Sequence, residues 1–208
     1  MRARRPLLAR AFAGGSEGNE QLTAVTGVVL IVLLAALGVT ILRIGQMLNA
    51  HMFIGMLLLG PVALKMASTG YRFVRYYAGN HTYRLKGPPA LELRMLAPFV
   101  VVLTVAVFAS GVALLLVGPS HRGFLGSLHK VSFVLWLGVT GLHVFGHLAE
   151  MPRALAGAAR RERGWDDHGA GRGSRALLLA SAIAGGLIIA FVAQSQFGIW
   201  AHYHHGGG

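Results

Sequence analysis

Five long apolar runs constrain what this chain can fold into more than any other feature. Each has about the 20 residues that a helix needs to cross a hydrocarbon core roughly 30 Å thick. With 54% hydrophobic and 12% charged residues, and a mean hydropathy of +0.59, the chain is too apolar for an ordinary soluble domain. We therefore expect an all-α membrane protein with five transmembrane helices. The runs are approximately Leu22–Leu42, Ala50–Gly70, Leu93–Val117, Leu125–Ala149 and Ala176–Phe197.

The net charge of +12 is distributed unevenly between the two ends of these runs. Of the 19 Lys and Arg residues, 15 lie before the first run, between the second and third, between the fourth and fifth, or, in the case of Arg94, at the start of the third. The positive-inside rule assigns that side to the cytoplasm. We expect a multi-pass protein of the bacterial cytoplasmic membrane, with its N-terminus inside and its C-terminus outside. The charge therefore indicates topology and contact with membrane lipid, and no nucleic-acid binding is expected.

This topology divides the chain into four expected parts, without a cleavable signal peptide. The second part is a four-helix core, and the fifth helix is peripheral to it. The absence of cysteine excludes disulfides, thiolate zinc sites, iron–sulfur clusters and covalently attached haem. The parts are a cytoplasmic basic N-terminus (1–21), the helical core (22–150), a cytoplasmic linker (151–175), and the fifth helix with an external His-rich tail (176–208).

Two of the runs carry nitrogen donors at the same spacing. His51 and Lys65 lie fourteen residues apart in one run, and His129 and His143 lie fourteen apart in another. Fourteen helical residues span about 21 Å and return to nearly the same face of the helix. Two such helices side by side would offer one pair of donors near each membrane surface. A haem iron takes one axial ligand from each side, so His51 and His129 are the expected outer pair, with Gly55 leaving room for the macrocycle.

The inner donors leave alternatives open. Lys65 ligates iron only as a neutral amine. Otherwise it pairs with a haem propionate or extends its side chain to the interface. His147 lies one turn beyond His143, and it is an alternative inner ligand, a propionate partner or a contact for a quinone head group. Met66 is a weaker candidate for an axial ligand, because methionine in an apolar helix usually serves packing.

Two polar clusters lie outside the runs. His202, His204 and His205 near the C-terminus are able to bind Cu²⁺ or Zn²⁺, although a tail does not preorganise a site. A second cluster follows the second run. It is able to bind haem propionates or a quinone, or it is an ordinary belt of aromatic and basic residues at the membrane interface. Its members are Arg72, Arg75, Tyr76 and Tyr83.

The donor pattern resembles the four-helix haem core of the cytochrome b superfamily. It is similar to the small bacterial di-haem membrane cytochromes b, including the membrane subunits of hydrogenases and formate dehydrogenases. The resemblance covers roughly residues 20–150 and depends on His51, His129 and His143, with Lys65 where the family pattern has a fourth histidine. It implies haem b, two groups or at least one, and electron transfer across the bilayer between a quinone or protein redox partner and an acceptor.

The resemblance implies an electron-transfer subunit, or a metal or quinone reductase, and we assign no catalytic residue. A homo-oligomer is compatible with this interpretation. Two other classes remain open at this point: a metal-ion transporter whose path is lined by histidines, and a cofactor-free anchor subunit of a larger complex. Visible absorption by haem would separate the first interpretation from both.

Overall fold

The computed structural model describes residues 15–85, 91–148 and 172–200, and every regular element within them is helical. Five of the helices are long and apolar enough to cross a membrane, which confirms the expected fold class. The long helices are α2 (Gly15–Leu42), α3 (Ile44–Tyr77), α5 (Leu91–Val117), α6 (Arg122–Leu148) and α8 (Arg172–Ala193). The short ones are α4 (His81–Arg84) and the 3₁₀ turns η1 (Pro119–His121) and η2 (Gln194–Gln196).

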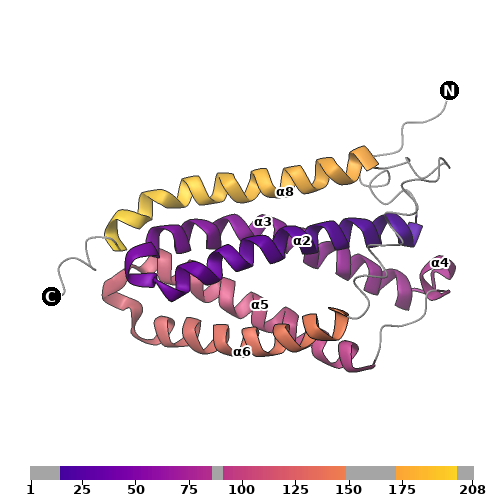
Figure 1. The fold of residues 1–208 in the computed structure, drawn as a ribbon, viewed down its shortest axis with the longest axis horizontal. Coiled ribbons are helices and arrows are strands. Elements are labelled where there is room, and N and C mark those ends of the chain that lie inside the picture. Colours follow the sequence, from indigo (N-terminus) through magenta and orange to yellow (C-terminus); the bar gives the residue numbers. More distant parts are fainter. Residues whose placement is uncertain (1–14, 86–90, 149–171, 201–208) are drawn as a thin grey trace.

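The long helices form two antiparallel hairpins and one added helix (Figure 1). Helix α3 packs against α2 in the first hairpin and against α8 outside it, while α5 packs against α6 in the second hairpin. The hairpins meet mainly where α3 approaches α5, and α3 scarcely touches α6. The second helices of the two hairpins therefore lie across the bundle from each other with little direct packing between them.

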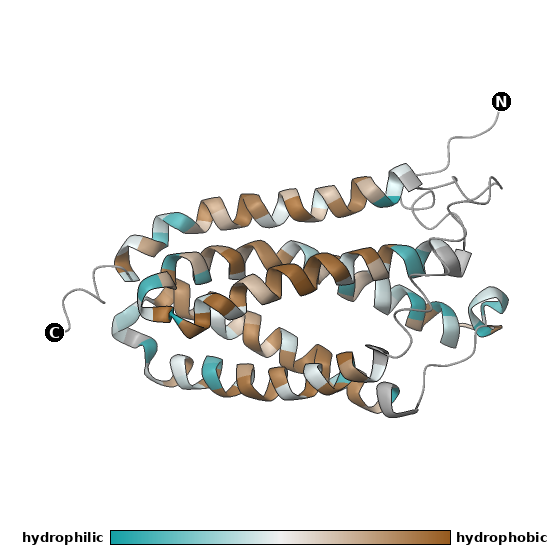
Figure 2. Ribbon diagram, viewed as in Figure 1, coloured by the Kyte–Doolittle hydropathy of each residue, from teal (hydrophilic) through white to brown (hydrophobic). Residues whose placement is uncertain are grey.

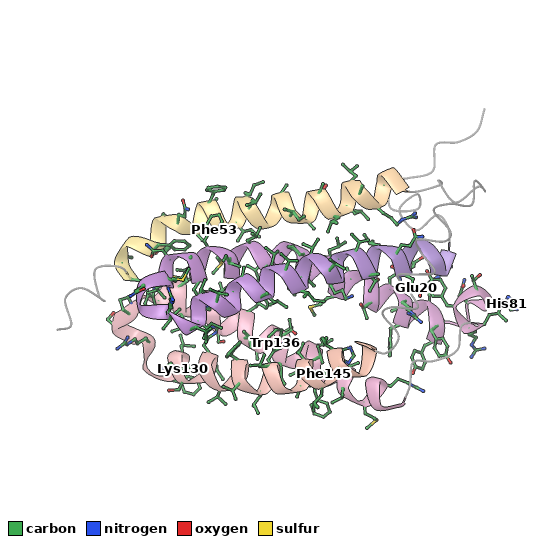
Figure 3. All side chains as sticks on the ribbon, viewed as in Figure 1. Glu20, Phe53, His81, Lys130, Trp136 and Phe145 are labelled. Atoms are coloured by element: carbon green, nitrogen blue, oxygen red, sulfur yellow. The ribbon has the colours of Figure 1, made fainter. Side chains whose placement is uncertain are left out.

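Apolar residues cover most of the length of the helices, and polar residues gather toward their ends (Figure 2). Many large apolar side chains are exposed, including Val32 at 63% and Phe145 at 74%. Exposure on this scale suits helices whose solvent is lipid, because lipid tails contact apolar side chains without penalty. One buried apolar cluster joins α3, α5 and α8, and Phe53 meets Phe191 edge to face at 5.3 Å beside it (Figure 3). The cluster consists of Met56, Leu115, Ala190, Phe197 and Trp200.

Helices α3 and α8 touch backbone to backbone at two glycines. A Cβ atom on Gly60 would lie 1.9 Å from the carbonyl oxygen of Ala182, and one on Gly186 would lie 2.1 Å from that of Leu57. Such contacts are possible only for glycine, and small residues commonly let membrane helices approach closely. The fifth helix therefore packs outside the four-helix core, closely against α3.

Helix α3 extends beyond the expected second run at both ends. It begins at Ile44, directly after α2, with a kink at Met47 where an external loop was expected. It continues to Tyr77, into the expected cytoplasmic loop. There Gly79 adopts a φ of +81°, and the amides of Gly79 and Asn80 donate to the carbonyls of Tyr76 and Arg75. This pattern of hydrogen bonds ends the helix at a left-handed glycine.

Several expected segments fall outside the described residues. They are the N-terminus as far as residue 14, the linker as far as residue 171, and the tail at residues 201–208 with its three histidines. Helix α2 begins at Gly15, inside the expected N-terminal part, and α8 begins at Arg172, inside the expected linker.

Candidate functional site

The donors on α3 and α6 occur at matching heights. His51 lies seven residues after Ile44, where α3 begins, and His129 lies seven residues after Arg122, where α6 begins. Seven residues correspond to about 10 Å along a helix. Lys65 and His143 each lie fourteen residues further along the same helices. The two helices therefore carry their donors in the same register from the same end of the bundle.

The ring of His51 is oriented by the helix that precedes it. Its Nδ1 lies 3.0 Å from the Oγ1 atom of Thr40 on α2, and that hydroxyl is 2.5 Å from the carbonyl oxygen of Leu37. Because the carbonyl accepts the single hydroxyl proton, Nδ1–H of His51 is the donor to Oγ1. The other ring nitrogen, Nε2, then carries the lone pair and is turned away from Thr40.

The ring of His129 is held in the same way by α5. Its Nδ1 lies 3.1 Å from the carbonyl oxygen of Val107 and 3.1 Å from the Oγ atom of Ser110. A carbonyl can only accept, so Nδ1 carries the proton and Nε2 the lone pair. The ring lies against Gly111, where a Cβ atom would be 3.1 Å from its Cε1 atom. Glycine at this position makes room for the imidazole.

Together the two histidines form a pair across the bundle. Each histidine comes from the second helix of its hairpin and donates Nδ1–H to the first helix. At both places a hydroxyl, that of Thr40 or Ser110, also bonds the carbonyl three residues earlier in its own helix. On α3, a Cβ atom at Gly55 would meet nothing within 4 Å, so space is open one turn inward of His51. Two imidazole lone pairs beside open space are the donor set that a bis-histidine haem requires.

Lys65 is directed to α2. Its Nζ atom donates to the carbonyl oxygen of Thr23 at 2.7 Å and lies against Gly27, where a Cβ atom would be 3.2 Å away. The same contact region includes Asn19, whose amide nitrogen donates to the carbonyl of Ser68 at 3.0 Å. The Thr23 hydroxyl donates to the Asn19 carbonyl at 2.8 Å, and its oxygen lies 3.0 Å from the Ser68 hydroxyl. Lys65 is thus part of a polar contact between the two helices of the first hairpin.

The inner half of α6 carries a second row of polar groups. His143 is half-buried there, and Trp136, nearer the middle of the helix, donates from Nε1 to the hydroxyl of Thr104 on α5 at 2.8 Å (Figure 3). His147 is within α6, but its side chain is outside the described part of the structure, as are the three histidines of the tail. Met66 lines an apolar cavity of about 540 Å³ between α3 and α5.

The residues that orient the histidines were missed by the sequence analysis. Thr40 and Ser110 are hydroxyl residues toward the C-terminal ends of the otherwise apolar helices α2 and α5, and each lies in the helix that precedes a histidine. A short turn brings residues equally distant from it to the same height, and this was the available signal. Gly111 had no comparable signal, because the chain contains 29 glycines.

Metal sites of other kinds find no support among the described side chains, where no group of three or more His, Cys, Asp or Glu residues gathers. No family model, curated protein or solved structure matches the chain.

Proposed function

We propose that this chain is a b-type haem cytochrome of the membrane, with His51 and His129 as the axial ligands of one haem. The observation that carries the proposal is the pair of imidazoles whose Nδ1–H groups are bonded to neighbouring helices. Their Nε2 lone pairs are thereby left for iron. Histidine ligands of metals almost always donate their other ring nitrogen to such a partner, which orients the ring and raises its basicity.

The residues around this pair fit a haem. Gly111 accommodates the ring of His129, and the space beside Gly55 is open. Apolar side chains on the surrounding helices exclude water and lower the local dielectric constant, which tunes the reduction potential. When bound, haem supplies one-electron redox chemistry. Thr40 and the Val107 carbonyl hold the protons at Nδ1, so the histidines meet the iron as neutral ligands.

The inner pair fits a second haem less well. An ammonium group has no lone pair, and Lys65 already donates to the Thr23 carbonyl. Ligation by Lys65 requires the neutral amine, which has two hydrogens for such bonds and one lone pair for a metal. We therefore assign one haem to the outer pair and treat a second haem at Lys65 and His143 as the hypothesis for a stoichiometry measurement.

In this proposal the protein transfers electrons within a larger redox system. A quinone or a protein partner supplies or accepts the electrons. The strongly basic side faces the cytoplasm of a bacterial cell by the positive-inside rule. A cofactor-free anchor would leave the matched imidazoles unexplained. A histidine-lined transporter would need more donors converging on one ion.

The absorption spectrum of the purified protein tests the proposal directly. After expression with ample iron and porphyrin precursor, we expect a strong visible spectrum that changes on reduction with dithionite. His51→Ala and His129→Ala each remove the outer haem, whereas His81→Ala, on the exposed surface of α4, leaves the spectrum unchanged. A colourless wild-type protein would overturn the proposal.

The haem-to-protein ratio then decides the inner site. With the outer pair alone, the wild-type protein and Lys65→Ala both bind one haem per chain. A ratio of two that falls to one in Lys65→Ala, and likewise in His143→Ala, would assign Lys65 as an axial ligand.

A further inference from the structure

A group of arginine and tyrosine side chains lies at the end of the bundle opposite the histidine pair. This end contains Glu20 and His81, while Lys130, beside His129, is at the other end (Figure 3). The group combines the last turns of α3 with α4, and we call it the arginine ledge. It consists of Tyr71, Arg72, Arg75, Tyr83 and Arg84.

The ledge is ordered by the turn at Gly79. The turn brings α4 back against α3, so Tyr83 is only 5% exposed and its ring lies 6.2 Å from that of Tyr71. The guanidinium carbon of Arg75 lies 5.8 Å from the centre of the Tyr71 ring, within the range of a cation–π interaction. The buried Tyr83 and the partly buried Tyr71 therefore form an ordered pair of rings, with Arg75 over one of them.

The cations of the ledge are not neutralised by the tyrosine below them. Burial, and to a lesser extent Tyr71, raise the pKa of the Tyr83 phenol above its ordinary value, although Arg75 and Arg72 oppose this. The phenol is therefore neutral at physiological pH. Among the side chains that the structure describes, Glu20 is the one carboxylate, and the three arginines of the ledge outnumber it. The summed charge of these described groups is positive.

Large apolar side chains are exposed beside these arginines. Phe73 is 62% exposed, Val74 61% and Leu85 73%, while Tyr77 accepts a hydrogen bond from Arg94 of α5 at 2.7 Å. A soluble anion would leave these apolar groups in water. A lipid bilayer covers them and places phosphates at the level of the arginines, since aromatic and basic side chains gather at membrane interfaces.

We propose that the arginine ledge binds the phosphate of an anionic phospholipid, with Arg72 and Arg75 as its main contacts. Arginine presents several donors in a planar fork that matches phosphate oxygens, and this favours a held lipid over diffuse attraction. The bound lipid covers Phe73 and Leu85 with its glycerol and acyl regions. This site is independent of the haem proposal.

Lipid binding to the full-length protein tests this site. The protein is purified in detergent, delipidated, and titrated with phosphatidylglycerol or phosphatidylcholine while bound lipid is counted by native mass spectrometry. We expect phosphatidylglycerol to bind at least 10-fold more tightly than phosphatidylcholine, with inorganic phosphate at millimolar concentration failing to displace it. Arg72→Gln with Arg75→Gln should abolish this preference, whereas Arg43→Gln with Lys130→Gln, which removes two positive charges at the opposite end, should keep it.

A charge-conserving variant keeps the experiment decisive. Arg72→Lys with Arg75→Lys retains the charge but loses the planar fork, so we expect weaker phosphatidylglycerol binding than in the wild type. Equal binding of the two lipids by the wild type would overturn the proposal, as would equal loss in the ledge and control variants. Displacement by inorganic phosphate would show a free-anion site and would also overturn it. Helical content by circular dichroism identifies variants that fail to fold, and for these the lysine variant decides.

Discussion

At the scale of single residues, the hydroxyl groups of Thr40 and Ser110 make equivalent contacts with a histidine ring. Each hydroxyl bonds the carbonyl three residues earlier in its own helix and contacts Nδ1 of a histidine on the next helix. The two histidines differ in the acceptors available to Nδ1–H. In His129 this group has both the Val107 carbonyl and the Ser110 hydroxyl, whereas in His51 the partner shown is the Thr40 hydroxyl. We therefore expect the proposed haem site to be more sensitive to loss of the hydroxyl at Thr40 than at Ser110.

Thr40→Val tests this difference. Valine keeps the shape of threonine but leaves the Nδ1–H of His51 without an acceptor, and loss of such a partner typically weakens metal binding 10- to 100-fold. We expect the haem affinity to fall by about that factor, measured by titrating haem into the apo-protein. Thr26→Val is the matched control, since the hydroxyl of this buried residue on α2 bonds the Leu22 carbonyl. Equal haem affinity in the two variants would contradict this role for Thr40.

Gly111→Ala tests the space beside His129. The added Cβ atom would lie 3.1 Å from Cε1, so the ring must shift slightly from the position in which Nδ1 bonds the Val107 carbonyl. We expect haem retention after purification to fall and the reduction potential to change. Gly138→Ala, on α6 where a Cβ atom meets nothing within 4 Å, should keep both at the wild-type values. If both variants keep the wild-type spectrum and potential, Gly111 does not position the ligand.

At the scale of elements, the contact between α3 and α8 depends on a pair of glycines. Gly60 and Gly186 each bring a backbone within reach of the opposing carbonyl, while Gly185, adjacent in sequence, has open space around its Cβ position. The distinction between Gly185 and Gly186 depends on the rotation of α8 and cannot be inferred from the residue types.

Gly186→Ala should therefore destabilise the protein and Gly185→Ala should not. A methyl group 2.1 Å from the Leu57 carbonyl forces the two helices apart, and overpacking of this kind typically costs 1–3 kcal/mol. We expect a lower midpoint of thermal unfolding in detergent for Gly186→Ala, followed by circular dichroism. Similar midpoints for the two variants would show that the helices separate without cost.

At the scale of the whole molecule, the uneven charge predicts the orientation in the membrane. The absence of cysteine allows single cysteines to report it without background labelling. In intact bacterial cells, a membrane-impermeant maleimide should label Gln46→Cys, at the exposed start of α3, and should label Thr82→Cys, on exposed α4, only after the cells are opened. The reverse pattern would place the basic end outside.

The amino-acid sequence alone predicted much of the architecture and the depth of the donors. Five apolar runs require helices, because a backbone in lipid must satisfy its own hydrogen bonds, and a spacing of fourteen places two donors on one helical face. The equal heights of His51 and His129 followed from that spacing and from short connections. The ends of α3 were predicted less well, since the arginine and tyrosine residues after residue 70 suit a helix as readily as a loop.

Only the tertiary structure decided how each donor is used. The spacing predicts that Lys65 lies level with His143, but it does not determine which neighbouring helix the Lys65 side chain meets. In the structure, helix packing directs the amine to the Thr23 carbonyl on α2. In the same way, packing selects Gly111 among many glycines and gives His51 and His129 their Nδ1 partners. Apolar runs are uniform in character, so the contacts between them depend on how the helices rotate and approach, and these are properties of the assembled bundle.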